Sequence, residues 1–124
     1  MRNDVNESIR AAAILGFLGV AIGAFGAHLF EDRLIAMDRV DTWETAVLYH
    51  LIHSVGLLAL GGLGVRASLV RFTRHAWIVG IVIFSGSLYI LSLTGIGWLG
   101  AITPIGGLAF LAGWLWLLRI ALWD

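Results

Sequence analysis

The sequence predicts an all-α fold, a bundle of four transmembrane helices that run up-down-up-down through a bilayer. Hydrophobic residues fill 60% of the 124 positions and charged residues only 13%, unlike the balance in soluble domains. The apolar residues gather in four runs, at positions 11–30, 46–65, 76–94 and 101–118. Each run is close to the ~20 residues with which a helix crosses ~30 Å of hydrocarbon. We therefore expect one integral membrane domain over residues 1–124, with the lipid bilayer as its solvent.

The first run carries small residues at spacings of three and four, which place them in one stripe along a helix. The glycines of this stripe are Gly16, Gly19, Gly23 and Gly26. Helices in lipid attract each other mainly through close packing, so the stripe predicts a helix–helix contact. We expect that contact inside the bundle, and a contact between two copies of the chain is the alternative.

The connection after the first run, residues 31–45, mixes apolar side chains with charges in a roughly helical pattern. Its apolar members are Leu34, Ile35, Met37, Val40 and Trp43. A helix with this pattern can lie flat at the membrane surface. We expect an interfacial helix in this connection.

The second run contains Tyr49, His50 and His53. Tyr49 lies four residues before His53 and His50 lies three before it, so each pair can face a common point on a helix. Counted from the start of this run at position 46, these side chains lie within ~12 Å of the outer surface. The run therefore predicts a polar site in the outer leaflet.

The third and fourth runs add hydroxyl groups. Ser85, Tyr89 and Ser92 share one helix face and are expected to hydrogen-bond between helices. Pro104 is best tolerated in a first helical turn, so regular helix in the fourth run is expected to begin near it. The glycine-rich residues before Pro104 would then be irregular backbone.

The charges predict an orientation. With four spans, both termini and the connection between the second and third runs share one side. That side carries Arg2, Arg10, Arg66, Arg71, Arg74 and Arg119, and the other side carries only two arginines among five acids. By the positive-inside rule both termini are cytoplasmic. Residues 66–75 are expected to form a basic turn against anionic headgroups.

Several motifs recur in an order typical of one family. They are Gly23 to His28, Thr45 with Tyr49 and His53, Phe84 to Tyr89, Thr103 to Gly107, and Phe110 to Trp114. Through all four spans they resemble the YgdD/YwdK-like small membrane proteins, the domain-of-unknown-function family numbered 423. The resemblance implies a four-span protein of the bacterial inner membrane, with relatives in mitochondria, and it implies no activity. The family usually has glutamine where this chain has His50, which makes His50 a weaker candidate for a shared role than His28 or His53.

The candidate site is a layer of polar groups drawn from all four helices. Its members are His28, His53, His50, Tyr49, Tyr89, Ser85 and Thr103. We interpret the layer first as a structural hydrogen-bond network, because polar groups in hydrocarbon need partners. The alternatives are a metal or haem site that uses His28 and His53, a proton or ion relay, and an outer-leaflet pocket for lipid or quinone.

The sequence favours a protein without enzymatic activity. It has no cysteine, and no set of residues typical of hydrolysis, nucleotide chemistry or nucleic-acid binding. We therefore expect a small accessory or scaffold protein that associates with itself or with a larger membrane complex. We predict no cofactor, with metal or haem the less favoured possibility. The alternative function is an outer-leaflet ligand-binding or transport protein for a metal, haem, quinone, lipid or proton.

Overall fold

A computed structural model describes residues 2–62 and 67–123, and every regular element in these ranges is helical. In chain order the elements are α1 (Arg2–Ala21), η1 (Ile22–Gly26), α2 (Ala27–Leu29), α3 (Glu31–Ala36), α4 (Val40–Gly62), α5 (Ala67–Gly80), η2 (Ile81–Ser85), α6 (Gly86–Thr94) and α7 (Leu99–Trp123). The segments η1 and η2 are π-helical turns within longer helices. The predicted all-α fold is confirmed.

Four continuous helices are long and apolar enough to cross a bilayer. They are Arg2–Leu29, Val40–Gly62, Leu69–Thr94 and Leu99–Trp123. Each begins before its predicted run, because apolar residues mark only the part of a helix that lies in hydrocarbon. Backbone hydrogen bonding carries the helix on through neighbouring polar residues. The predicted end of the second run, at positions 63–65, lies outside the described residues.

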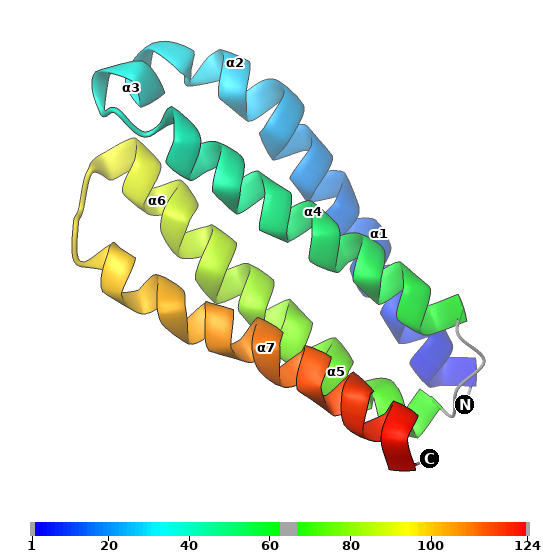
Figure 1. The fold of residues 1–124 in the computed structure, drawn as a ribbon. Helices are drawn as coiled ribbons and strands as arrows, with labels where there is room; N and C mark the ends of the chain where they lie inside the picture. The colour runs from blue at the N-terminus through cyan, green and yellow to red at the C-terminus, as the bar shows by residue number, and fades with distance from the viewer. Residues whose placement is uncertain (1, 63–66, 124) are drawn as a thin grey trace.

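The four long helices form a bundle (Figure 1). The helix α1 packs along α4, α7 packs along α5 and η2, and the contact of α4 with α6 joins the two pairs. Both ends of the described chain lie at one end of the bundle, while α3 and the link between α6 and α7 lie at the other. An up-down-up-down order of four spans requires this placement.

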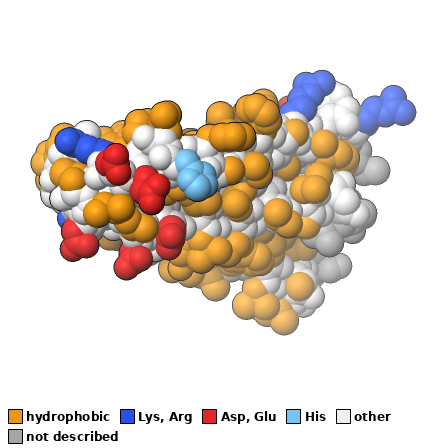
Figure 2. Space-filling view, turned by 90° about the horizontal axis from the view of Figure 1, so that it is seen from above, with side chains coloured by type: hydrophobic (Ala, Val, Ile, Leu, Met, Phe, Trp, Pro, Cys, Tyr) orange, Lys and Arg blue, Asp and Glu red, His pale blue; other side chains and the backbone are white. Residues whose placement is uncertain are grey.

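The surface of the bundle suits a bilayer. In Figure 2 acidic side chains gather toward one end of the face shown, and hydrophobic side chains cover the part beyond them. Large apolar side chains point outward from all four long helices; examples are Phe17, Leu58, Val82 and Leu115. Exposed apolar surface on this scale favours lipid over water.

The glycine stripe of the first span faces α4. A Cβ atom at Gly19 would lie 2.6 Å from Leu51, and one at Gly23 would lie 2.8 Å from Val47. A Cβ at Gly26 would meet the Trp43 ring at 2.8 Å. These glycines therefore let α1, η1 and α4 approach within the same chain, where we expected the stripe to pack.

The connection between the first two spans is not one interfacial helix. The helix α3 ends at Ala36, and Asp38 adopts a left-handed backbone conformation with φ 54° before α4 begins at Val40. Leu34 is buried, whereas Ile35 on α3 is exposed. The connection thus folds back onto the bundle, and Trp43 belongs to the first turns of α4.

The fourth span also departs from prediction. The helix α7 starts at Leu99, five residues before Pro104, so the expected irregular stretch up to Pro104 is absent. The preceding helix α6 ends at Thr94, and the next residue, Gly95, has a φ of 71° and forms a left-handed cap that favours glycine. Pro104 removes only the bond to the Gly100 carbonyl, close to the helix start, where lost bonds disturb the helix least.

Candidate functional site: a histidine network between the helices

His50 lies at the junction of three helices. The side chain is 3% exposed, and both ring nitrogens have partners. A carbonyl can only accept, so His50 Nε2–H donates to the Leu15 carbonyl oxygen at 2.8 Å. In the neutral ring Nδ1 then accepts from the Tyr89 hydroxyl, also at 2.8 Å. His50 thereby connects α4 to α1 and α6.

A glycine makes this junction possible. A Cβ at Gly19 would lie 3.3 Å from Cδ2 of His50, so a larger residue would crowd the imidazole. Gly19 is one turn beyond Leu15 on α1, and the missing side chain leaves room for the ring to reach the Leu15 carbonyl. The glycine stripe and His50 are therefore parts of one contact.

His53 joins α4 to α7. Its Nδ1–H donates to the Tyr49 carbonyl oxygen at 2.9 Å, and Nε2 accepts from the indole Nε1–H of Trp114 at 3.1 Å. The imidazole also stacks on Phe110, with ring centroids 3.7 Å apart. Tyr49 thus contributes its backbone carbonyl to the network, while its ring stacks near His53 and Phe84.

Both buried histidines have their hydrogen-bonding capacity filled within the chain. The lone pair that each neutral imidazole would offer to a metal already accepts a bond, from Tyr89 in one case and Trp114 in the other. Within residues 2–62 and 67–123, no group of three or more histidine or carboxylate side chains could hold a metal ion. The arrangement favours structural bonding over metal ligation.

The predicted hydroxyls make separate bonds between helices. Ser85 donates to the Ala46 carbonyl oxygen at 2.7 Å, which links η2 to α4. Thr103 on α7 lies 2.7 Å from the hydroxyl of Ser87 on α6. Ser92 instead donates to the Leu88 carbonyl of its own helix. The sequence did not single out Ser87.

His28 does not join the other histidines. It is exposed at the end of the first span, where it lines a cavity with Glu31, Trp43 and Glu44. The sequence ranked His28 above His50 as a candidate for the site, and the structure reverses this ranking. His50 bonds to two neighbouring helices, whereas His28 lies outside the network. Spacing along one chain could not place His28, because its neighbours come from α3 and α4.

His50 lies near the midpoint of α4. His50 is ten residues after the start of α4 at Val40 and twelve before its end at Gly62. At ~1.5 Å per residue it is ~15 Å from the first residue of the helix. Its partner Leu15 is likewise central in the helix Arg2–Leu29. The predicted depth is counted from position 46, where the apolar run begins six residues after the helix does, so the outer-leaflet position stays a prediction.

A second polar cluster, at the end with the termini, was missed. The side chain of Arg74 is 3% exposed and lies 2.7 Å from Oε2 of Glu7 and 3.6 Å from Oδ1 of Asp4. Arg71 pairs with the same aspartate at 3.2 Å. Residues 2–10 are therefore helical and packed against α5, and residues 67–75 are helical instead of the predicted basic turn.

The sequence did hold a signal for this cluster. Asp4 and Glu7 are three residues apart, as are Arg71 and Arg74, so each pair presents one charged face on a helix. Both pairs fall at the same end of the predicted bundle. The buried Trp77 was also missed; its indole N–H donates to the Phe110 carbonyl at 3.3 Å.

Comparison with known proteins gives one consistent match. The model of the family described as protein of unknown function, DUF423, matches residues 22–107. The matched range contains His28, His50, His53, Tyr89 and Thr103, and it excludes the Asp4 and Glu7 segment. No solved structure matches the chain.

Curated relatives are small membrane proteins over nearly their whole length. UPF0382 membrane protein SH2409 of Staphylococcus haemolyticus is 47% identical over 107 residues, 86% of this chain and 87% of the relative. UPF0382 membrane protein YwdK of Bacillus subtilis is 46% identical over 83% of this chain and 85% of its own. UPF0382 inner membrane protein YgdD of Escherichia coli is 39% identical over 83% and 79%.

Proposed function

We propose that this chain, which belongs to the DUF423 family of membrane proteins, is a non-enzymatic accessory or scaffold protein of the bacterial inner membrane. It acts by associating with itself or with a larger membrane complex. The observation that carries the proposal is the histidine network, since His50 and His53 hold helices together with every ring nitrogen in use. These hydrogen bonds stabilise the arrangement of the helices. A fixed arrangement gives the bundle a defined lipid-facing surface, and a membrane partner would recognise that surface.

The small mass outside the bilayer supports lateral association. Four long apolar helices account for most of the chain, and the helical segment α3 between the first two has only six residues. A partner would therefore meet the protein chiefly through its lipid-facing sides. The outer faces of α1 and α7 offer Phe17, which is 74% exposed, and Leu115, which is 65% exposed.

Site-specific photo-crosslinking in native membranes tests this association. A photoreactive amino acid at Phe17 or Leu115 should give a discrete, stoichiometric adduct with a second copy or another membrane protein. The same amino acid at Ile35, which is 61% exposed but lies on α3, is the matched control outside the apolar band. If neither Phe17 nor Leu115 gives an adduct and the chain stays strictly monomeric in native membranes, the proposal is contradicted.

Purification in a mild detergent separates this function from ligand binding. We expect no haem absorption and no stoichiometric metal by elemental analysis, and we expect His50→Ala and His53→Ala to lower thermal stability only. A metal, haem or quinone that copurifies with the wild type and is lost in the His53→Ala variant would favour a binding or transport function instead.

The orientation belongs to the same proposal: both termini face the cytoplasm. The excess of arginine at the end with the termini supports it through the positive-inside rule. The chain has no cysteine, so single cysteines can report on each side. A membrane-impermeant maleimide added to spheroplasts should label Asp32→Cys and leave Asn6→Cys unlabelled until the membrane is opened; the reverse pattern would invert the orientation.

A further inference from the structure

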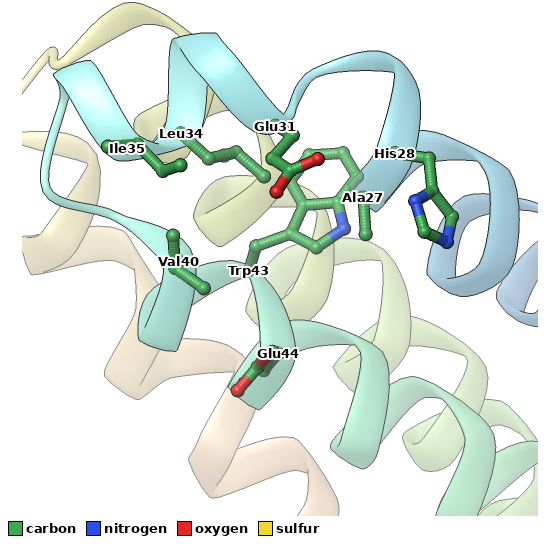
Figure 3. A pocket seen from close by; sticks show the side chains of 8 residues that line it. All are labelled: Ala27, His28, Glu31, Leu34, Ile35, Val40, Trp43 and Glu44. Carbon is green, nitrogen blue, oxygen red and sulfur yellow. The ribbon is translucent and has the colours of Figure 1, made fainter.

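A cavity of about 260 Å³ opens at the α3 end of the bundle, between α2, α3 and the first turns of α4 (Figure 3). Its polar lining comes from His28, Glu31, Trp43 and Glu44, and its apolar walls include Leu34. None of the groups of the histidine network lines it. The cavity is thus a separate feature, and its occupant is a question beyond lateral association.

The cavity contains a buried donor without an acceptor. Trp43 is 4% exposed, and its indole Nε1–H has no hydrogen-bond partner among the described residues. In Figure 3 the indole nitrogen lies on the side of Ala27, another residue of the cavity wall. Buried polar groups are nearly always hydrogen-bonded, so this donor indicates an acceptor atom supplied from outside the chain.

The rim of the same cavity is acidic. Glu31 and Glu44 are exposed, and the salt bridges formed within the described residues involve neither of them. Unpaired carboxylates favour a cation, and an ammonium group can donate N–H bonds to a carboxylate. The neighbouring indole would add attraction for the same charge. The wall thus suits a ligand that carries a cation and a hydrogen-bond acceptor together.

An apolar groove leads from the cavity toward the middle of the membrane. It has a volume of about 320 Å³ and runs between the first span and α4, along Gly23, Val47 and Leu51. Trp43 and Glu44 line both the cavity and the groove, so the two are continuous. A side chain at Gly23 would meet Val47 of the groove wall, and the mostly apolar lining suits a hydrocarbon chain.

We propose that this cavity and groove bind an ethanolamine-type phospholipid from the leaflet on the α3 side. The ammonium binds at the acidic rim that Glu31 and Glu44 form, a phosphodiester oxygen accepts from Trp43 Nε1–H, and one acyl chain lies along the groove. The first turns of α4 lie at the boundary of the apolar band, which is where headgroups lie. A phosphatidylglycerol lacks the ammonium, and a choline headgroup cannot donate N–H bonds to the carboxylates.

Native mass spectrometry of the full chain in detergent micelles tests the headgroup. The protein is titrated with dioleoyl phosphatidylethanolamine, phosphatidylcholine or phosphatidylglycerol. We expect the wild type to retain the ethanolamine lipid at least about fivefold more tightly than the other two. The double variant Glu31→Gln/Glu44→Gln should lose this preference, whereas Asp41→Asn, an exposed acid on α4 outside the cavity lining, should keep it.

A Trp43→Phe variant tests the phosphodiester contact. Removal of the indole N–H should weaken binding of all three lipids by a similar factor, because all three carry the phosphate. Thermal unfolding checks that this variant folds, and if it does not, the exposed glutamate variants decide. Equal binding of the three lipids by the wild type, or an ethanolamine preference that survives in the double glutamine variant, would overturn the proposal.

Discussion

Gly106 on α7 provides a sharp test of helix packing in this bundle. A Cβ atom at this position would lie 2.4 Å from the Phe84 backbone nitrogen and 2.8 Å from its Cα. These are backbone atoms of η2, so no side-chain rotation relieves the contact. Gly106→Ala therefore forces α7 away from η2 by roughly 1 Å, the gap between 2.4 Å and an ordinary contact of at least 3.4 Å.

The destabilisation expected from this clash is partly offset by the higher helix propensity of alanine. Overpacking of this kind destabilises by about 1–3 kcal/mol. The movement would also strain the bond between Ser87 and Thr103, one turn from Gly106, worth about 0.6 kcal/mol in a membrane. Alanine returns up to about 1 kcal/mol through its higher helix propensity. We expect Gly106→Ala to lower the free energy of unfolding by about 0.6–2.6 kcal/mol.

The neighbouring glycine is a matched control. A Cβ at Gly107 would come no closer than 3.9 Å, to Cδ2 of Phe84, which is an ordinary contact. Gly107→Ala keeps the propensity gain without the clash, so it should leave stability unchanged or raise it slightly. Unfolding in mixed micelles at increasing dodecyl sulfate, followed by the fluorescence of the 6 tryptophans, measures both variants.

The reasoning fails if the two alanine variants unfold within about 0.5 kcal/mol of each other, the usual range for harmless surface substitutions. It also fails if Gly106→Ala is the more stable of the two. Either result would mean that α7 and η2 do not approach each other at Gly106 as closely as the structure has them.

Further substitutions test the polar contacts and the helix cap at Gly95. Tyr89→Phe removes the donor to His50 Nδ1 and should cost about 0.6–1.7 kcal/mol in unfolding free energy. In the His50→Ala background the same substitution should cost almost nothing, so a double-mutant cycle should give a coupling energy of that size, and zero coupling would contradict the bond. Arg74→Gln leaves the carboxylates of α1 without their buried partner and should cost about 2–4 kcal/mol, whereas Arg71→Gln at a half-exposed site should cost far less by the same measurement. In Gly95→Ala the alanine must adopt a φ of 71°, which should lower the unfolding free energy by about 1 kcal/mol and reduce the thermal midpoint. An unchanged midpoint would contradict the left-handed cap.

The spans could be predicted because hydrocarbon imposes a local requirement. Every backbone group in the bilayer core must be bonded within its own segment, so a run of ~20 apolar residues can only be a helix. The ends of the helices could not be predicted in the same way. Residues 2–10 are helical because Asp4 and Glu7 meet arginines of α5, a contact between segments more than 60 residues apart.

The residues of the candidate site were predicted only in part, since His28 lies outside the network, and the hydrogen-bond partners of the two buried histidines were not predicted. Spacing within α4 predicted that His50 and His53 can face a common point, whereas His50 bonds to α1 and α6 and His53 bonds to α7. It could not indicate that the partners of these rings are the Leu15 carbonyl and the Trp114 indole. A backbone carbonyl has no signature in the sequence, and a tryptophan in a membrane helix is equally typical of a lipid-facing anchor.

The sequence by itself determined that this chain is a membrane protein of four helices, because composition and run length alone decide which structure a bilayer tolerates. The tertiary structure decided which polar groups meet: it brought His50 to α1 and α6, His53 to α7, and left His28 at an outer cavity with Trp43. The physical reason is that burial in lipid depends on one helix, whereas a hydrogen bond between helices depends on the rotation and depth of two.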